Sequence, residues 1–181
     1  MTMDKKAVEF LERHLFSEED MNAYAILDGA SVPNLRQKLY DLDPEHECLY
    51  RGELTPDMEE VAPYLIRLGP EEEFTRWVMA EGWGRHWGIY AVSRADLRTL
   101  RTHFRRFLMV HDSEGKPMYF RYYDPRVLRV YLPTCNAGEL KTLFGPVQMY
   151  LVEDQDPKSG RMFLFTKNQM RDEKVTLSRG A

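Results

Sequence analysis

Four polar residues directly follow apolar runs of the chain, where general acid–base chemistry is most often placed: Asp28, His111, Asp112 and Asp124. His111 beside Asp112 is the one adjacent pair of a histidine and a carboxylate among them. Turn and cap formation explains the same residues without catalysis, because Gly29, Ser113 and Pro125 follow them. There is no Gly-x-Ser-x-Gly nucleophile motif. We therefore expect no catalytic residues and no enzyme activity.

Metal and nucleotide sites need side chains or glycines at fixed spacing, and this chain lacks both patterns. Its histidines are scattered, at positions 14, 46, 86, 103 and 111. His46 and Cys48 alternate on one predicted strand, and a solvated histidine beside a buried cysteine accounts for them. The glycines of GWGRHWG (82–88) precede a strand rather than a helix, and no P-loop lysine follows them. We expect no cofactor, no metal and no small-molecule substrate.

Arginines form a more distinctive pattern. Arg94, Arg98, Arg101 and Arg105 are spaced four, three and four residues apart, so on one helix they fall within a narrow arc. Arg126 and Arg129 repeat the spacing on a later predicted helix. Three interpretations stay open: ion pairs with the acidic first half of the chain, an acidic protein partner, or nucleic acid. Nucleic acid is the weakest, because the chain is acidic overall and has no aromatic-basic RNA motif.

The segment EGWGRHWGIY (81–90) combines two tryptophans, three glycines and a histidine. Such a loop indicates either a close approach between backbones or a docking surface. A tight turn that buries Trp83 and Trp87 leaves Arg85 and His86 exposed at its tip. We expect Trp83, Arg85 and His86 to form one protein-binding surface together with the arginine stripe (Arg94, Arg98, Arg101 and Arg105), and we include Arg126 and Arg129 as further candidates.

Composition favours one α/β domain of ordinary size. The 181 residues are 43% hydrophobic and carry a net charge of −4. Residues 1–80 hold 8 Lys and Arg against 18 Asp and Glu, a net of −10, and residues 81–181 hold 17 against 11, a net of +6. The two halves form opposite poles, or folding interleaves them. The apolar runs are short and the first residues are charged, so we expect a cytoplasmic protein with reduced Cys48 and Cys135 in its core.

Hydrophobic periodicity predicts the elements that position these residues. Helices are expected over 4–15 and 31–42, and another begins after Gly69-Pro70. A fourth helix begins at a Ser93 cap and buries Leu97, Leu100, Phe104 and Leu108. Two more follow, one after Asp124 and one from Asn136 to Gly145-Pro146. Strands are expected over 24–28, 48–52, 64–68 and 87–92, the last covered on both faces. Trp87, Phe120, Tyr122 and Leu128 are predicted core residues.

Two hairpins are predicted late in the chain, over 108–123 and over 147–166, and a polar, frayed tail follows. The chain divides into an N-terminal amphipathic helix (1–21), a core (22–154), and a short hairpin strand with the tail (155–181). The resulting fold class is α/β (α+β), a mixed β-sheet flanked by helices on both faces.

Seven segments in order resemble the DUF4123 family: YAILDGA, CLYRG, APYLIRL, EGWGRHWGIY, LRTHFRRFLMVHD, MYFRYYDPRVLRVYLPT and FGPVQMYLVED. Three of them, from residues 81, 100 and 118, are specific, and the resemblance spans roughly 22–154. It implies a cytoplasmic adaptor, or effector chaperone, of the type VI secretion system of Gram-negative bacteria. Such a protein binds a cargo effector (a toxin) and loads it onto the VgrG spike protein. Many relatives carry a longer C-terminal helical lobe, whereas this chain ends soon after the core.

Two other functions stay open from the residues themselves. One is a hydrolase that uses a strand-end carboxylate with His111, which requires His111 within hydrogen-bond reach of Asp28 or Asp124. The other is a nucleic-acid-binding domain that uses the arginine stripe. The resemblance favours the adaptor, with protein partners, no nucleic acid and no membrane.

Overall fold

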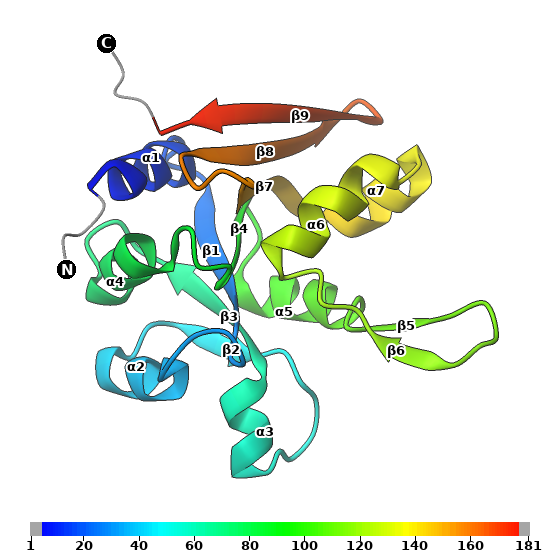
Figure 1. Ribbon diagram of the computed structural model, residues 1–181, viewed down its shortest axis with the longest axis horizontal. Helices are drawn as coiled ribbons and strands as arrows, with labels where there is room; N and C mark the ends of the chain where they lie inside the picture. The colour runs from blue at the N-terminus through cyan, green and yellow to red at the C-terminus, as the bar shows by residue number, and fades with distance from the viewer. Residues whose placement is uncertain (1–4, 178–181) are drawn as a thin grey trace.

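A seven-stranded antiparallel sheet forms the centre of the computed structural model, which describes residues 5–177 (Figure 1). The strand order is β2-β3-β1-β4-β7-β8-β9. The strands are β1 Asn22–Asp28, β2 His46–Cys48, β3 Pro63–Leu68, β4 Gly88–Ser93, β7 Val147–Glu153, β8 Ser159–Thr166 and β9 Gln169–Thr176. The expected α+β class is confirmed, but every strand pairing in the described residues is antiparallel, where a mixed sheet was expected.

Helices cover both faces of this sheet, as expected (Figure 1). On one face lie α1 Lys5–Leu15, α2 Leu35–Leu42 and α4 Glu73–Gly82. On the other lie α5 Leu97–Arg105, α6 Pro125–Tyr131, the 3₁₀ turn η1 Leu132–Thr134 and α7 Ala137–Phe144. The short helix α3 Pro56–Val61 buries none of its residues and lies beside the end of the sheet.

Alternation along the central strands divides the core into two layers. In β4, Ile89 and Ala91 contribute to the layer under α5, and Tyr90 and Val92 contribute to the layer under α1 and α4. Successive side chains of a strand point to opposite faces, so a strand that is apolar throughout needs cover on both. The prediction for β4 is therefore confirmed, and α1 belongs to the same core as the sheet.

The predicted buried positions largely agree with the structure. The α5 stripe of Leu97, Leu100 and Phe104 is buried, and Leu108 continues it. Of the four predicted core residues, Trp87, Tyr122 and Leu128 are buried and Phe120 is partly buried against the core. Both cysteines are free thiols of intermediate exposure, not fully buried.

The helix caps confirm two predictions and correct one. Asp124 caps α6, and Asn136 with Glu139 forms a complete capping box on α7. Ser93 does not cap α5, because Asp96 accepts the hydrogen bond from the Thr99 N–H at 2.8 Å. Ser93 is instead the last residue of β4, where its hydroxyl donates to the Pro146 carbonyl. Arg94 therefore precedes the helix on which it was predicted.

Two predictions were wrong and one helix was missed. The second strand is residues 46–48 rather than 48–52, since the chain turns away after Leu49 and Gly52 has φ of 81°. Helix α3 was missed, although Thr55 accepts from the Met58 N–H and Pro56 begins the helix. The polar tail is not frayed, because β9 pairs with β8 over eight residues. Only residues 178–181 of that tail lie outside the described part.

The first predicted hairpin forms a separate two-stranded arm: β5 Met109–His111 and β6 Pro117–Tyr119. It extends beyond the body of the molecule between α5 and α6 (Figure 1). All six strand residues are exposed, so the sheet does not cover the arm.

Candidate functional site

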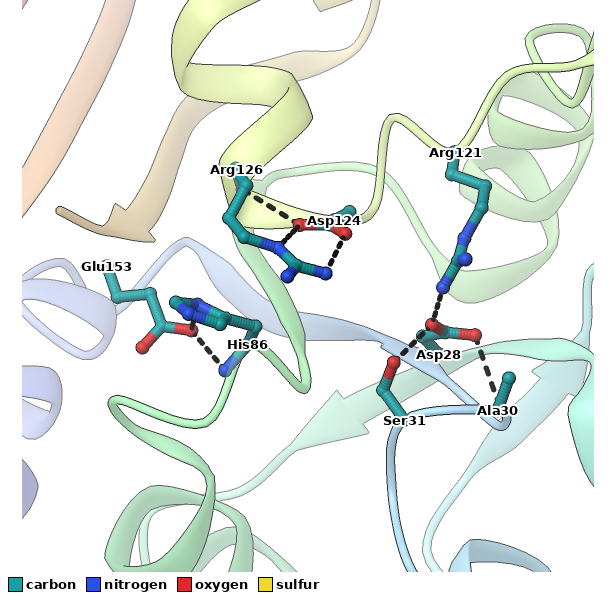
Figure 2. A network of polar contacts seen from close by, with 8 residues as sticks. All are labelled: Asp28, Ala30, Ser31, His86, Arg121, Asp124, Arg126 and Glu153. Carbon is teal, nitrogen blue, oxygen red and sulfur yellow. Dashed lines mark hydrogen bonds and ion pairs between the residues drawn. The ribbon is translucent and has the colours of Figure 1, made fainter. Parts of the chain in front are cut away.

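Three buried carboxylates gather at one end of the sheet: Asp28, Asp124 and Glu153, which are 2%, 7% and 4% exposed. Asp28 ends β1 and Glu153 ends β7. Strand β4 lies between β1 and β7 and runs antiparallel to both. The last residues of β1 and β7 therefore lie at the same end of the sheet. Asp124, at the start of α6, lies at this same end of the sheet (Figure 2). We call Asp28, Asp124, Glu153 and their hydrogen-bond partners the polar cluster.

Asp28 anchors the turn after β1. Its carboxylate accepts hydrogen bonds from the Ser31 hydroxyl at 2.6 Å, from the Ala30 N–H at 3.2 Å and from Arg121. Burial would lower the pKa of the Arg121 guanidinium, but the Asp28 charge and hydrogen bond raise it overall. Both carboxylate oxygens of Asp28 therefore accept hydrogen bonds within the fold.

Asp124 holds the start of α6. Its Oδ1 accepts from the Arg126 N–H at 2.9 Å and Nε at 3.0 Å, and its Oδ2 accepts from an Arg126 terminal nitrogen at 2.7 Å. Burial opposes ionisation of Asp124, yet the hydrogen bonds and charge of Arg126 keep the pKa of this carboxyl below its ordinary value. Asp124 is therefore a charged helix cap.

Glu153 joins the glycine-rich loop to β7. Its Oε1 accepts from the His86 backbone N–H at 2.5 Å and lies 3.0 Å from His86 Nδ1 (Figure 2). Its Oε2 is buried, and no described residue donates to it. Burial raises the pKa of Glu153, and His86 opposes that rise. The backbone carbonyl of Glu153 accepts from Arg129 at 3.2 Å, so α6 contacts the same residue.

The glycine-rich loop is built around a close approach of two backbones, which was one of its two predicted roles. A Cβ at Gly88 would lie 2.1 Å from the Ile26 carbonyl oxygen, so only glycine allows β1 and β4 to pair there. Trp87 is buried and Arg85 lies over its ring at 5.8 Å. Arg85 is exposed and His86 partly so, as predicted for the tip.

Trp83 is fixed within the fold rather than presented to a partner. Its indole N–H donates to the Pro157 carbonyl at 2.7 Å, and its ring lies 5.3 Å from Phe10 and stacks 6.5 Å from Tyr90. These contacts tie α1, β4 and the β7–β8 turn together. Trp83 therefore acts chiefly as a packing residue.

Most of the predicted arginines pair within the chain. Arg94 binds Asp20 and Arg101 binds Glu47, each at 2.9 Å. Arg105 donates to the carbonyls of Cys48 and Tyr50 at 2.8 and 3.1 Å. Together with Arg126 and Arg129, these contacts favour the intramolecular interpretation of the pattern. The contacts of Arg94, Arg101 and Arg105 join the basic second half to the acidic first half. Arg98 is exposed, and no hydrogen bond or ion pair of its guanidinium is described within residues 5–177.

The predicted binding residues do not form one surface. Trp83 packs with the core layer of α1 and α4, whereas the arginines of α5 lie beside the opposite layer. The sheet separates them, and sequence spacing gave no means to assign the two faces. The structure does bring His86, Arg126 and Arg129 together around Glu153. Figure 2 shows the contact of His86 with that carboxylate.

The hydrolase arrangement is not assembled. His111 is exposed on the arm, and the described partners of Asp28 and Asp124 are arginines, Ser31 and backbone N–H groups. Among residues 5–177, His, Cys, Asp and Glu side chains form no group of three or more that is suited to a metal ion. In the same part of the chain, every helix is too short or too polar to span a bilayer.

Sequence reasoning missed Glu153 and Arg121. Glu153 had a visible signal, since it is a carboxylate at the end of the apolar run VQMYLVE. Arg121 had none, because its partner Asp28 lies 93 residues away.

The polar cluster draws on four of the segments described above: residues 24–30, 81–90, 118–134 and 144–154. The family model described as "Domain of unknown function (DUF4123)" matches residues 23–142, which is most of the chain and includes Asp28, His86 and Asp124. No curated protein and no solved structure matches the chain. With a family match over more than half of its length, the chain belongs to the DUF4123 family.

Proposed function

We propose that this protein is a type VI secretion adaptor that binds a cargo effector and loads it onto a VgrG spike in the cytoplasm of a Gram-negative bacterium. Membership of the DUF4123 family over residues 23–142 is the observation that carries the proposal. The adaptor role itself comes from the resemblance of this chain to that family. Its partners are then proteins, without nucleic acid, membrane or small-molecule substrate, and it is not an enzyme.

The polar cluster supports a binding role over a catalytic one. Asp28 and Asp124 are occupied by arginines and backbone donors that lock turns and helix starts. A general base needs a free lone pair within reach of a substrate proton. In this cluster, Glu153 Oε2 has no partner, but it is buried away from solvent. The polar cluster therefore stabilises the turns and the helix start at this end of the sheet.

The exposed surface also supports binding. Large apolar side chains are exposed on the arm, with Tyr119 65% exposed and Met118 46% exposed. Exposed aromatic and methionine side chains that lie close together are typical of protein interfaces.

A deletion and secretion assay tests the proposal. Removal of the gene from its host should abolish export of one effector while leaving that effector present in the cell. Export of every other type VI effector should continue, because an adaptor serves its own cargo. Unchanged export of all effectors from the deletion strain would overturn the proposal.

A further inference from the structure

An open cavity of about 420 Å³ with a mixed apolar and basic lining lies between the arm and the body. Its apolar lining comes from three places in the chain: Leu54 and Met58 at α3, Leu108 and Met109 at the start of the arm, and Tyr119 on β6. Tyr119 lies 5.9 Å from the ring of Tyr50, which connects the arm to the body. We call this the arm cavity.

The side chains around the arm cavity are exposed to an unusual degree for their size. Met58, Met109 and Tyr119 are 42%, 44% and 65% exposed. Methionine is flexible and adapts to differently shaped apolar partners. Tyrosine gives a large contact area at low entropic cost, and it is enriched among residues that dominate binding energy. The arm cavity therefore has the composition of a site for apolar side chains of a partner.

Every charged residue that lines the arm cavity is an arginine: Arg51, Arg105 and Arg106. Within residues 5–177, no ion pair to a carboxylate is described for any of the three, in contrast to nearby Arg101 with Glu47. Arg105 is held by two backbone carbonyls, and its buried Nε has no described partner. Burial is the main cause that lowers the pKa of Arg105, and the nearby charge of Arg101 lowers it further, whereas Cys48 and Glu47 oppose the shift.

We propose that the arm cavity binds an acidic amphipathic segment of a partner protein, a step that rests on the adaptor function proposed above. Apolar side chains of the segment occupy the cavity between Met58, Met109 and Tyr119. Its carboxylates pair with Arg51 and Arg106 at the rim. Arginine matches a carboxylate with two parallel hydrogen bonds, so the rim selects acidic residues and their spacing.

A peptide fits this site better than a nucleic acid or a lipid surface does. Single-stranded nucleic acid needs a groove that follows its backbone together with flat rings for its bases. The arm cavity is a single compact hollow rather than a long groove, and aliphatic and methionine side chains line it beside the rings of Tyr50 and Tyr119. An anionic membrane attracts clustered basic residues and needs no apolar cavity between an arm and a body.

Selection from a random peptide display library on the full-length protein tests the proposal. The double variant R51E/R106E serves as the counter-selection target, and K116E on the same arm is the matched control because Lys116 does not line the cavity. The expected consensus combines apolar residues with Asp or Glu. A consensus peptide should bind R51E/R106E at least roughly tenfold more weakly than wild type and bind K116E equally. Replacement of its carboxylates by Lys should restore binding to R51E/R106E.

Other outcomes overturn the proposal. These are no enrichment over the counter-selection target, a neutral or basic consensus, or equal binding to wild type and R51E/R106E when both keep the same melting temperature. Tighter binding of a random single-stranded DNA or of anionic lipid vesicles than of the consensus peptide would also overturn it.

The failure of this inference is distinguishable from failure of the adaptor function. If R51E/R106E still restores effector export in the deletion strain and binds the consensus peptide as wild type does, the arm cavity is not the peptide-binding site and the adaptor role stands. If the wild-type gene is dispensable for export while the peptide result holds, the adaptor role fails and the cavity remains an acidic-peptide site.

Discussion

Glu153 and His86 meet through a single oxygen atom. Oε1 of the buried Glu153 carboxylate takes both the His86 backbone N–H at 2.5 Å and the His86 ring nitrogen Nδ1 at 3.0 Å. An ionised carboxylate only accepts hydrogen bonds, so Nδ1 carries the proton when both bonds form. This contact fixes His86 at φ of 57°, and it leaves Oε2 buried without a described partner.

Replacement of Glu153 by Gln should change the pH dependence of stability. Burial raises the pKa of Glu153 above its unfolded value. The folded protein therefore binds this proton more tightly than the unfolded chain, and its stability falls as pH rises from the unfolded pKa to the folded one. Gln does not ionise, so the stability of Glu153→Gln relative to wild type should increase between pH 4 and pH 8.

Urea unfolding at both pH values measures this difference. The exposed Glu18→Gln variant is the control for the loss of one carboxylate at the surface. If the difference in unfolding free energy between Glu153→Gln and wild type does not change with pH, burial does not raise the pKa of Glu153.

Loss of the Asp124 cap should destabilise α6. Asp124→Ala removes the acceptor for the Arg126 N–H and should cost about 1–2 kcal/mol of unfolding free energy. Asp124→Asn keeps an acceptor and should cost less. The pKa of Asp124 is below its unfolded value, so its contribution is present above the unfolded pKa and is lost as pH falls through the folded one.

Thermal unfolding at pH 7 and pH 3 tests this prediction. The difference in melting temperature between each variant and wild type should be smaller at pH 3 than at pH 7. A difference from wild type that is equal at the two pH values would contradict a charged cap.

Alanine at Gly88 should prevent normal pairing of β1 with β4. The added Cβ would lie 2.1 Å from the Ile26 carbonyl oxygen in the centre of the sheet. We expect a loss of about 3 kcal/mol or more, or failure to fold. Gly115→Ala on the arm is the control, since nothing lies within 4 Å of its Cβ and only its φ of 80° is strained. The cost there should be about 1 kcal/mol. Equal stability of the two variants in urea unfolding would refute the close approach.

Charge reversal distinguishes a paired arginine from an unpaired one on the same helix. Arg101→Glu places a second carboxylate beside Glu47 and should cost about 1 kcal/mol. Arg98→Glu should change stability by less than about 0.5 kcal/mol, because its exposed side chain makes no described hydrogen bond or ion pair and only a weak electrostatic interaction with the exposed Asp96. Chemical unfolding of both variants in low salt and in 1 M salt measures the effect. The Arg101→Glu loss should shrink in high salt. An equal loss for both variants would contradict the pairing.

Local patterns predicted the elements whose signals lie within a few residues. The stripe of Leu97, Leu100 and Phe104 predicted the buried face of α5, because helical spacing and burial coincide there. Asn136 with Glu139 predicted the start of α7 for a similar reason, since both cap bonds form within one turn. Strand β4 was predictable from its apolar residues on both faces.

Tertiary pairing decided the parts that the sequence did not predict. The β9 residues 169–176 are polar, and they form a strand because β8 offers a full set of backbone partners at the sheet edge. Glu153 and His86 are separated by 67 residues, and Arg105 and the Cys48 carbonyl by 57. Contacts at such separation depend on the order of the strands, which periodicity does not specify.

Direct binding of the purified protein to the spike and effector proteins of its host tests the adaptor role most immediately. Isothermal titration calorimetry should detect a complex with one effector, with a dissociation constant of about 1 μM or below. A ternary complex with the VgrG spike should then elute together in size-exclusion chromatography. Absence of binding to every effector and every VgrG spike of that host, with the protein folded, would contradict the account.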